Sequence, residues 1–323
     1  MPFLTPEPAV DNTSPMIRSY QPGDEGGIVR LFAAVFQQEL PLPLWRWKYL
    51  RNGDPPPAYV AEEERQIVCH YGALCQRLAW EGKEVLGWDI VDVMCHPRYQ
   101  GRGLFRRAAQ EFIAQLRALS NSVLIYGFPG ERHRRLGERL VGYEPIVPVY
   151  KVQKTLSVGT PPFPAGVLVL RSLSPAWDHQ WQLLERRFGF VMKRDRQLLS
   201  WRYLERPDKR YRLLTVQDCP ALAVVSTETN KARLMEFLVE EYNTAAAHLL
   251  VRAVEALCRA EGIGEIEGWF ARFAWECRFL TEEGGFVGAE SDHYFECRVF
   301  DSRLRASWLA EHFYYSLGDY DVF

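Results

Sequence analysis

Residues 91–107 of the chain read VDVMCHPRYQGRGLFRR, and the fold can be worked out from this stretch. Its first residues are mostly apolar and favour a strand, which Pro97 ends because proline has no N–H to donate to a ladder. A short turn with two glycines, residues 100–103, follows. Apolar residues then recur at helical spacing, at Leu104, Ala108, Phe112, Leu116 and Leu119. The stretch therefore predicts a strand, a glycine turn and a helix in direct succession.

The start of this predicted helix has the features of an anion site. The first N–H groups of a helix have no partner within it, and the helix dipole makes that end positive. Glycines let a backbone approach a phosphate closely, and Arg102, Arg106 and Arg107 add positive charge. A pyrophosphate fits this pattern. The turn is too short for a P-loop, and the third glycine of a dinucleotide fingerprint is absent.

The motif resembles the pyrophosphate loop of the GNAT N-acyltransferase superfamily. The pattern of that loop is Gln/Arg-x-x-Gly-x-Gly/Ala after a strand, often with a proline three residues earlier. Gln100, Gly103 and Pro97 match it, whereas Phe105 replaces the final Gly/Ala. The longer string from residue 91 to residue 105 is similar to a bacterial branch of the superfamily.

The resemblance implies that acetyl-CoA, or another short-chain acyl-CoA, binds at this loop without a metal. The residues expected to contact it are Met94, Cys95, His96, Gln100, Gly101, Arg102, Gly103, Leu104, Phe105 and Arg106. From the residues alone, Cys95 is also a candidate for the protein core, and His96 for a cap of the loop.

Acyl transfer from a thioester to an amine needs a base for the amine and an acid for the departing thiolate. In the superfamily the base is often a carboxylate on the strand before the glycine turn, or acts through water, which implies Asp92. Asp89 lies on the same strand, and at three residues apart the two are expected on opposite faces. His70 on the neighbouring strand is the third candidate. Asp92 and His70 also fit purely structural roles.

The usual acid of the superfamily is a tyrosine four residues before the glycine that ends a later helix. Counting back from Gly142 gives Glu138, so that tyrosine is absent. Tyr126 and Tyr143 are the candidates to replace it.

Composition sets limits on the whole chain. Its 323 residues suggest two domains of ~150 residues each. A net charge of −2 and the lack of a run of ~18 apolar residues favour neither nucleic acid nor a membrane as partner. Residues 1–15 do not read as a signal peptide and are expected to be a loose arm. Seven scattered cysteines without a Cys-x-x-Cys motif favour free thiols and a cytoplasmic location.

The order of the predicted elements extends the resemblance along the chain. Strands at 58–62, 66–79 and 84–95 form an antiparallel meander before the glycine turn, and the strand at 123–127 returns parallel. With a last strand at 148–153, the order β-α-α-β-β-β-α-β-α-β is the one that the superfamily has.

A weak repeat follows a Pro/Gly-rich linker at 157–166, which separates an N-terminal domain, 1–156, from a C-terminal domain, 167–323. The string WRYL at 201–204 echoes WKYL at 47–50. Two glutamates, at 240 and 241, occupy the place of the glycine turn and would repel a pyrophosphate. We therefore expect an α+β fold of two tandem GNAT-like domains. Each has a mostly antiparallel mixed sheet flanked by helices, and only the first holds an acyl-CoA site.

The predicted function is an acyl-CoA-dependent N-acyltransferase acting on a primary amine of a small metabolite, with amino sugars as one class, by direct attack in a ternary complex. The protein is expected to be a monomer or homodimer. The alternative is a CoA-binding regulatory or scaffold protein with little catalysis, which the missing tyrosine and Phe105 favour. A third reading is a nucleotide-phosphate binder. Release of thiol from acetyl-CoA across a panel of amines distinguishes the first reading from the others.

Overall fold

A computed structural model describes residues 14–51, 57–119, 121–157, 159 and 161–320. The arm expected at the N-terminus therefore lies outside the described residues up to residue 13. No helix in the described part of the chain is long and apolar enough to cross a membrane.

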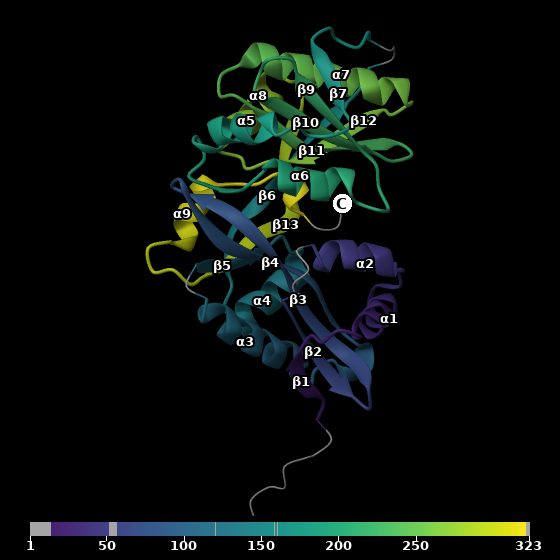
Figure 1. Cartoon of the computed structure of the whole chain (residues 1–323), viewed down its shortest axis with the longest axis vertical. Helices are drawn as coiled ribbons and strands as arrows, with labels where there is room; N and C mark the ends of the chain where they lie inside the picture. Colours follow the sequence, from purple (N-terminus) through teal and green to yellow (C-terminus); the bar gives the residue numbers. More distant parts are fainter. Residues whose placement is uncertain (1–13, 52–56, 120, 158, 160, 321–323) are drawn as a thin grey trace, which may run out of the picture.

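The first half of the chain follows the predicted order of elements (Figure 1). Its elements are β1 (Met16–Ser19), α1 (Glu25–Phe36), α2 (Leu42–Tyr49), β2 (Ala58–Glu63), β3 (Gln66–Trp80), β4 (Lys83–Cys95), the short 3₁₀ turn η1 (Pro97–Tyr99), α3 (Leu104–Arg117), β5 (Ser122–Gly127), α4 (Glu131–Val141) and β6 (Glu144–Thr155). The last of these strands is longer at both ends than the predicted strand at 148–153.

The second half repeats much of this order. Its elements are β7 (Val167–Leu170), α5 (Ala176–Glu185), β8 (Phe190–Met192), α6 (Arg196–Leu199), the π-helical turn η2 (Ser200–Leu204), β9 (Tyr211–Val216), β10 (Ala221–Thr227), β11 (Lys231–Val239), α7 (Thr244–Ala260), β12 (Glu265–Trp269), α8 (Trp275–Glu282), β13 (Val287–Val299), α9 (Ala306–His312), β14 (Phe313–Tyr314) and η3 (Leu317–Asp319).

All the described strands belong to one mixed sheet. Its order is β1-β2-β3-β4-β5-β13-β6-β12-β11-β10-β9-β7, with β8 and β14 beside this path. The pairs β4–β5 and β11–β12 are parallel, because each is joined through a crossover helix, and their neighbours in the sheet are antiparallel.

The two halves exchange strands where they meet. Residues 151–155 of β6 lie between β12 and the start of β13, so a strand from the first half completes the sheet of the second. Residues 296–299 of β13 pair with β5, so the second half completes the sheet of the first. The sequence gives no sign of this exchange, because strand pairing between distant segments leaves no local pattern.

Alternating residues of the first half's strands place helices on both sheet faces. On one face, Trp88 and Tyr71 pack with Phe112 of α3. On the other face, Val91 and Met94 pack with Trp45 and other residues of α1 and α2. Each fully buried large side chain contributes about 1.5–3 kcal/mol to folding.

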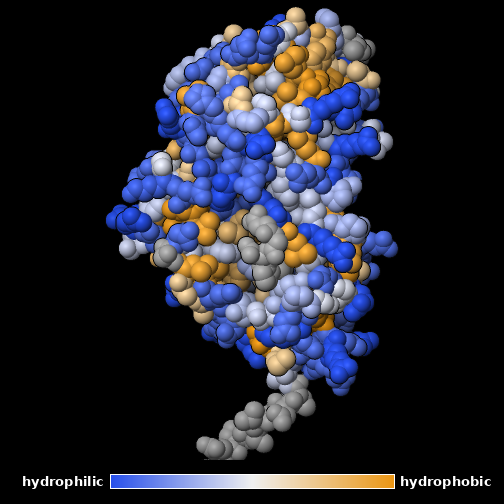
Figure 2. Space-filling model, in the orientation of Figure 1, coloured by the Kyte–Doolittle hydropathy of each residue, from blue (hydrophilic) through white to orange (hydrophobic). Residues whose placement is uncertain are grey.

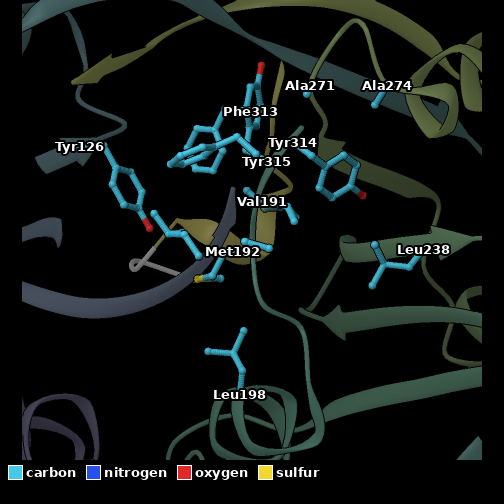
Figure 3. Close-up of a cluster of buried hydrophobic side chains, with 14 of the residues drawn as sticks. Tyr126, Val191, Met192, Leu198, Leu238, Ala271, Ala274, Phe313, Tyr314 and Tyr315 are labelled. Atoms are coloured by element: carbon cyan, nitrogen blue, oxygen red, sulfur yellow. The ribbon is translucent and has the colours of Figure 1, made fainter. Parts of the chain in front are cut away.

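A hydrophobic core joins the two halves (Figure 3). It includes Tyr126 of β5, Val191 of β8, and Phe313 and Tyr314 of β14. The repeated WKYL and WRYL strings meet nearby in a reciprocal contact. Trp47 and Trp201 stack at 4.7 Å, and each indole N–H donates to the backbone oxygen of the other at 2.9 Å.

Candidate functional site

The glycine turn leaves the N-terminus of α3 open. Gly101 and Gly103 have φ values of +78° and +75°, in the left-handed region that favours glycine. A Cβ on either would meet no described atom within 4 Å. In the described part of the chain, no side chain caps the first turn of α3. The first N–H groups of this 14-residue helix are therefore free to bind an anion.

The equivalent helix of the second half is closed. Asn243 stands at the N-cap of α7, and its side chain accepts a hydrogen bond of 3.1 Å from the N–H of Ala246. Exposed Glu240 and Glu241 precede it. A capped helix start beside two carboxylates disfavours phosphate on both steric and electrostatic grounds.

Some of the predicted loop residues anchor the loop, and others face solvent. Met94 and Leu104 are buried and anchor its two ends, and Phe105 packs 5.7 Å from the ring of Tyr71. Arg102 and Arg106 are exposed, and the Arg102 guanidinium lies 4.8 Å from the ring of Tyr99. The arginines therefore surround the open helix end, while the apolar residues contribute backbone rather than side chains.

The remaining predicted residues shape the turn. The His96 side chain accepts from the N–H of Arg98 at 3.3 Å, and Gln100 donates to the backbone oxygen of Cys95 at 3.3 Å. Cys95 faces Cys69 across the β3–β4 pair. A hydrogen bond from Cys69 lowers the pKa of the Cys95 thiol.

Strands β4 and β5 separate next to this loop. Their pairing ends at Asp89 and Tyr126. A Cβ on Gly127 would lie 3.7 Å from the backbone oxygen of Ile90 and close to little else. Among the described strands none pairs with residues 90–95 of β4 on this side. The result is a gap in the sheet beside residues 90–95 of β4, beyond the end of β5 at Gly127, and it runs toward the glycine turn.

A β-bulge at Asp92 changes the expected geometry of β4. Asp92 has a φ of +49°, and the register between β3 and β4 shifts beside it. Its carboxylate contacts α2, where it accepts from Lys48 Nζ at 2.9 Å and from Tyr49 Oη at 2.7 Å. Although burial opposes ionisation, Lys48 and Tyr49 keep the pKa of Asp92 below its ordinary value.

The prediction that Asp89 and Asp92 face opposite sides is wrong. Trp88 packs on α3, so Asp89 next to it points to the opposite face, the side of α1 and α2. Asp92 faces α2 as well, because the bulge places the consecutive residues Val91 and Asp92 on that same side. The two carboxylates therefore share a face of the sheet.

His70 is fully buried on this same face. Its Nδ1 lies 2.8 Å from the backbone oxygen of Asp92. Because a carbonyl can only accept, Nδ1 carries the proton and Nε2 has the lone pair. Nε2 has no hydrogen-bond partner among the described residues. Burial lowers the pKa of His70, so the ring is neutral at pH 7.

The contact between Tyr49 and Asp92 has a counterpart in the second half. There Tyr203 of η2 donates to Glu236 of β11 at 2.8 Å. This half has the closed helix start, so the repeated contact serves to fasten a helical turn to the sheet. The side chain of Asp92 thus positions α2 and the bulge.

Asp92→Asn is expected to destabilise the protein by about 2 kcal/mol at pH 7, because Lys48 loses its buried carboxylate. Asp92 has a lowered pKa in the folded state, so its stabilisation exists above the ordinary aspartate pKa and disappears as pH falls. Urea unfolding from pH 7 downward should therefore show a difference in stability between variant and wild type that stays large above the ordinary aspartate pKa of 3.8 and shrinks only below it. Equal stability at pH 7 would contradict this.

The side chains considered as acids lie in three places. Glu138 of α4 pairs with Arg134. Tyr143 shares a hydrogen bond with Tyr71 in the interior between α3, α4 and the sheet. Tyr126 is buried on the opposite face, in the core between the halves. The sequence did not point to Glu296, a buried carboxyl on the exchanged strand β13, because its place beside α4 depends on the exchange.

The comparisons with known proteins agree with this geometry. Residues 16–145 match the family of the acetyltransferase (GNAT) domain, and none of the curated proteins compared with the chain matches it. A protein from Enterococcus faecalis described as a probable N-acyltransferase superposes with a TM-score of 0.67 at 14% identity, over 89% of this chain and 73% of that one.

Two further structures have similar folds. A GCN5-related N-acetyltransferase from Anabaena variabilis has a TM-score of 0.66 at 12% identity, over 88% of this chain and 73% of that one. The N-myristoyltransferase of Saccharomyces cerevisiae, with bound myristoyl-CoA, has a TM-score of 0.62 at 11% identity, over 92% and 81%. At these identities the likeness concerns the fold. Residues 16–145 thus belong to the acetyltransferase (GNAT) domain family, and the fold of these structures extends along most of the chain.

Proposed function

We propose that this protein is an acyl-CoA-dependent N-acyltransferase that moves an acetyl or other short acyl group to a primary amine of a small metabolite. The observation that carries the proposal is the open, uncapped start of α3 beside the gap between β4 and β5. The proposed site lies in the N-terminal domain, 1–156, because the start of α7 is capped. Seven free cysteines in the described chain support a reducing, cytoplasmic setting.

In this proposal the protein binds acyl-CoA through two parts of the ligand, its pyrophosphate and its amide-bearing arm. Backbone N–H groups of α3, with Arg102 and Arg106, would bind the pyrophosphate. The unpaired edge of β4 at residues 90–95 spans roughly 17 Å and offers backbone donors and acceptors to an amide-bearing arm. The acyl group would then lie in the gap.

The proposed base is His70, on the α1/α2 face of the sheet. Its Nε2 has a free lone pair, and its neutral state at pH 7 suits removal of a proton from an ammonium group, directly or through one water. The backbone oxygen of Asp92 orients the ring. Asp89 faces the same side and is proposed to attract a cationic amine. The acceptor would approach from this face, and an amino sugar is one class with a suitable primary amine.

His70→Asn is expected to lower kcat about a hundred-fold while acyl-CoA still binds, because the shorter amide retains a donor for Asp92 but has no basic nitrogen. Thiol release from acetyl-CoA should be measured across a panel of primary amines, including amino sugars, with donor binding followed by thermal shift. A wild-type protein that binds acetyl-CoA but releases no thiol with any amine would favour the regulatory or scaffold alternative. Full activity in His70→Asn would exclude His70 as the base.

A further inference from the structure

Glu296 is a buried carboxyl group without an evident structural partner. It is 4% exposed, and its Oε2 has no hydrogen-bond partner among the described residues. Leaving a buried acceptor unpaired costs about 1–3 kcal/mol, and a charge costs more. A side chain kept at such a cost points to a role that the folded protein alone does not explain.

The position of Glu296 connects it with the gap between β4 and β5. Its strand, β13, pairs with β5, and Glu296 stands directly opposite Gly127, the residue at which β5 separates from β4. A Cβ on Gly127 would meet only Ile90 and Pro129 within 4 Å, leaving out its two chain neighbours, so the site of this glycine is not tightly packed.

Helix α4 covers the carboxyl group on the other side. Phe295 and Cys297 belong to the core between the halves, so Glu296 between them points to the face of α3 and α4. Its Oε1 lies 2.9 Å from the point that a Cβ on Gly137 would occupy. Only a glycine on α4 leaves room for the carboxyl here.

The surroundings of Glu296 keep it protonated at neutral pH. Burial, and then the negative charge of Glu138 on α4, raise its pKa to about 8, against the opposing charge of Arg134. The hydroxyls of Tyr71 and Tyr143 also face this interior, and Arg298 on β13 lies near them. These two tyrosine hydroxyls share a hydrogen bond with each other.

We infer that the carboxyl group of Glu296 is the general acid that protonates the departing thiolate, an assignment that rests on the proposed acyl transfer. The amine nitrogen forms a bond to the acyl carbon as the C–S bond breaks, and the electron pair of the C–S bond remains on sulfur. The Glu296 proton moves to that sulfur to give the free thiol. The proton lost by the amine goes to the base, and Glu296 regains one from solvent.

The acid and the base then stand on opposite faces of the sheet. Glu296 lies on the face of α3 and α4, and His70 on the face of α1 and α2. The gap between β4 and β5 is the opening through which both faces reach one reacting carbon. The strand exchange supplies the acid, because Glu296 comes from the second half of the chain.

The test compares Glu296→Gln with Glu138→Gln. Glu296→Gln should bind acetyl-CoA like the wild type but turn over roughly a hundred-fold more slowly at pH 7, without the fall in kcat that the wild type shows above pH 8. Glu138→Gln should keep its kcat at pH 6.5. The alkaline limb of its pH–kcat profile should move to lower pH, because loss of the negative charge at Glu138 lowers the pKa of Glu296.

Two readouts do not depend on turnover. The free wild type should show an infrared band of a protonated carboxyl that titrates near pH 8 and is missing in Glu296→Gln. A raised folded pKa means that stability falls as pH rises from the ordinary glutamate value of 4.5 to about 8, so the stability of Glu296→Gln should be nearest that of the wild type at pH 4.5 and exceed it at pH 9.

The possible failures are distinguishable. If the wild type neither binds acetyl-CoA nor releases thiol, the proposed function fails. If the wild type is active and Glu296→Gln has the same kcat and the same pH profile, the assignment of Glu296 is overturned and the proposed function remains. A Glu138→Gln profile with an unmoved alkaline limb would likewise overturn it.

Discussion

Gly103→Glu is expected to abolish the rise in thermal midpoint that acetyl-CoA produces in the wild-type protein. The substitution places a carboxylate where the pyrophosphate would lie and a Cβ on a residue with a φ of +75°. Together these effects should weaken binding at least about a thousand-fold, which is about 4 kcal/mol. At a ligand concentration a hundred times the wild-type Kd, the stabilisation RT ln(1 + [L]/Kd) would fall from about 2.7 kcal/mol to nearly zero.

Gly82→Glu is the matched control. Gly82 lies in the turn between β3 and β4 with a φ of +76°, and a Cβ there would also meet no described atom within 4 Å. Both variants should therefore lose similar stability without ligand, because both force glutamate into the left-handed region. Only Gly103→Glu should lose the ligand effect. An unchanged shift in Gly103→Glu would mean that acetyl-CoA binds elsewhere.

Arg194→Met is expected to cost roughly 3–5 kcal/mol of unfolding free energy at pH 8. The guanidinium is fully buried, donating to Glu236 at 3.1 Å and to Asp319 at 2.6 Å. It joins the loop after β8 to β11 and to η3. Removing it leaves two buried carboxylates beside each other without a cation, and urea unfolding measures the loss.

The loss should depend on pH. Burial raises the pKa of Asp319 to about 6 even with Arg194 present, so its charge costs stability as pH rises from the ordinary aspartate value through 6. Without Arg194 this cost grows. The difference in unfolding free energy between Arg194→Met and the wild type should therefore be smaller at pH 5 than at pH 8. Arg196→Met, which breaks an exposed pair with Asp178, should cost less than about 1 kcal/mol. Equal losses in the two variants would contradict the argument.

Local sequence signals were sufficient for much of the fold. The glycine turn after Pro97 and the apolar spacing from Leu104 correctly predicted β4, the turn and α3, because caps, prolines and periodicity act within a few residues. The helix ends at residue 117, so Leu119, the last residue of the predicted spacing, lies just beyond it. The repeated WKYL and WRYL strings identified equivalent turns, and these contact each other.

The geometry around the gap could not be predicted from the same signals. The bulge at Asp92 depends on how β3 and β4 pair, and it reverses the expected side of one carboxylate. The partners of Asp92 lie on α2, far away in sequence. Glu296 reaches the gap only because β13 crosses into the first half. Long-range pairing has no local pattern, so a single sequence does not reveal it.

Figure 2 shows how hydrophilic and hydrophobic side chains are distributed over one face of the molecule. Hydrophilic side chains dominate the view, and hydrophobic ones gather in smaller areas near the middle and the upper end of the molecule. The face on which the two halves meet therefore presents apolar atoms beside charged ones.

The strand exchange between β6 and β13 makes the protein a single cooperative unit. Each half alone would lack a central strand of its own sheet, so neither can open globally while the other stays folded. A break in the backbone at 157–166 would give two fragments that complement each other rather than two independent domains. Ligand bound at the glycine turn would accordingly slow amide hydrogen exchange in β12, far from any contact with it.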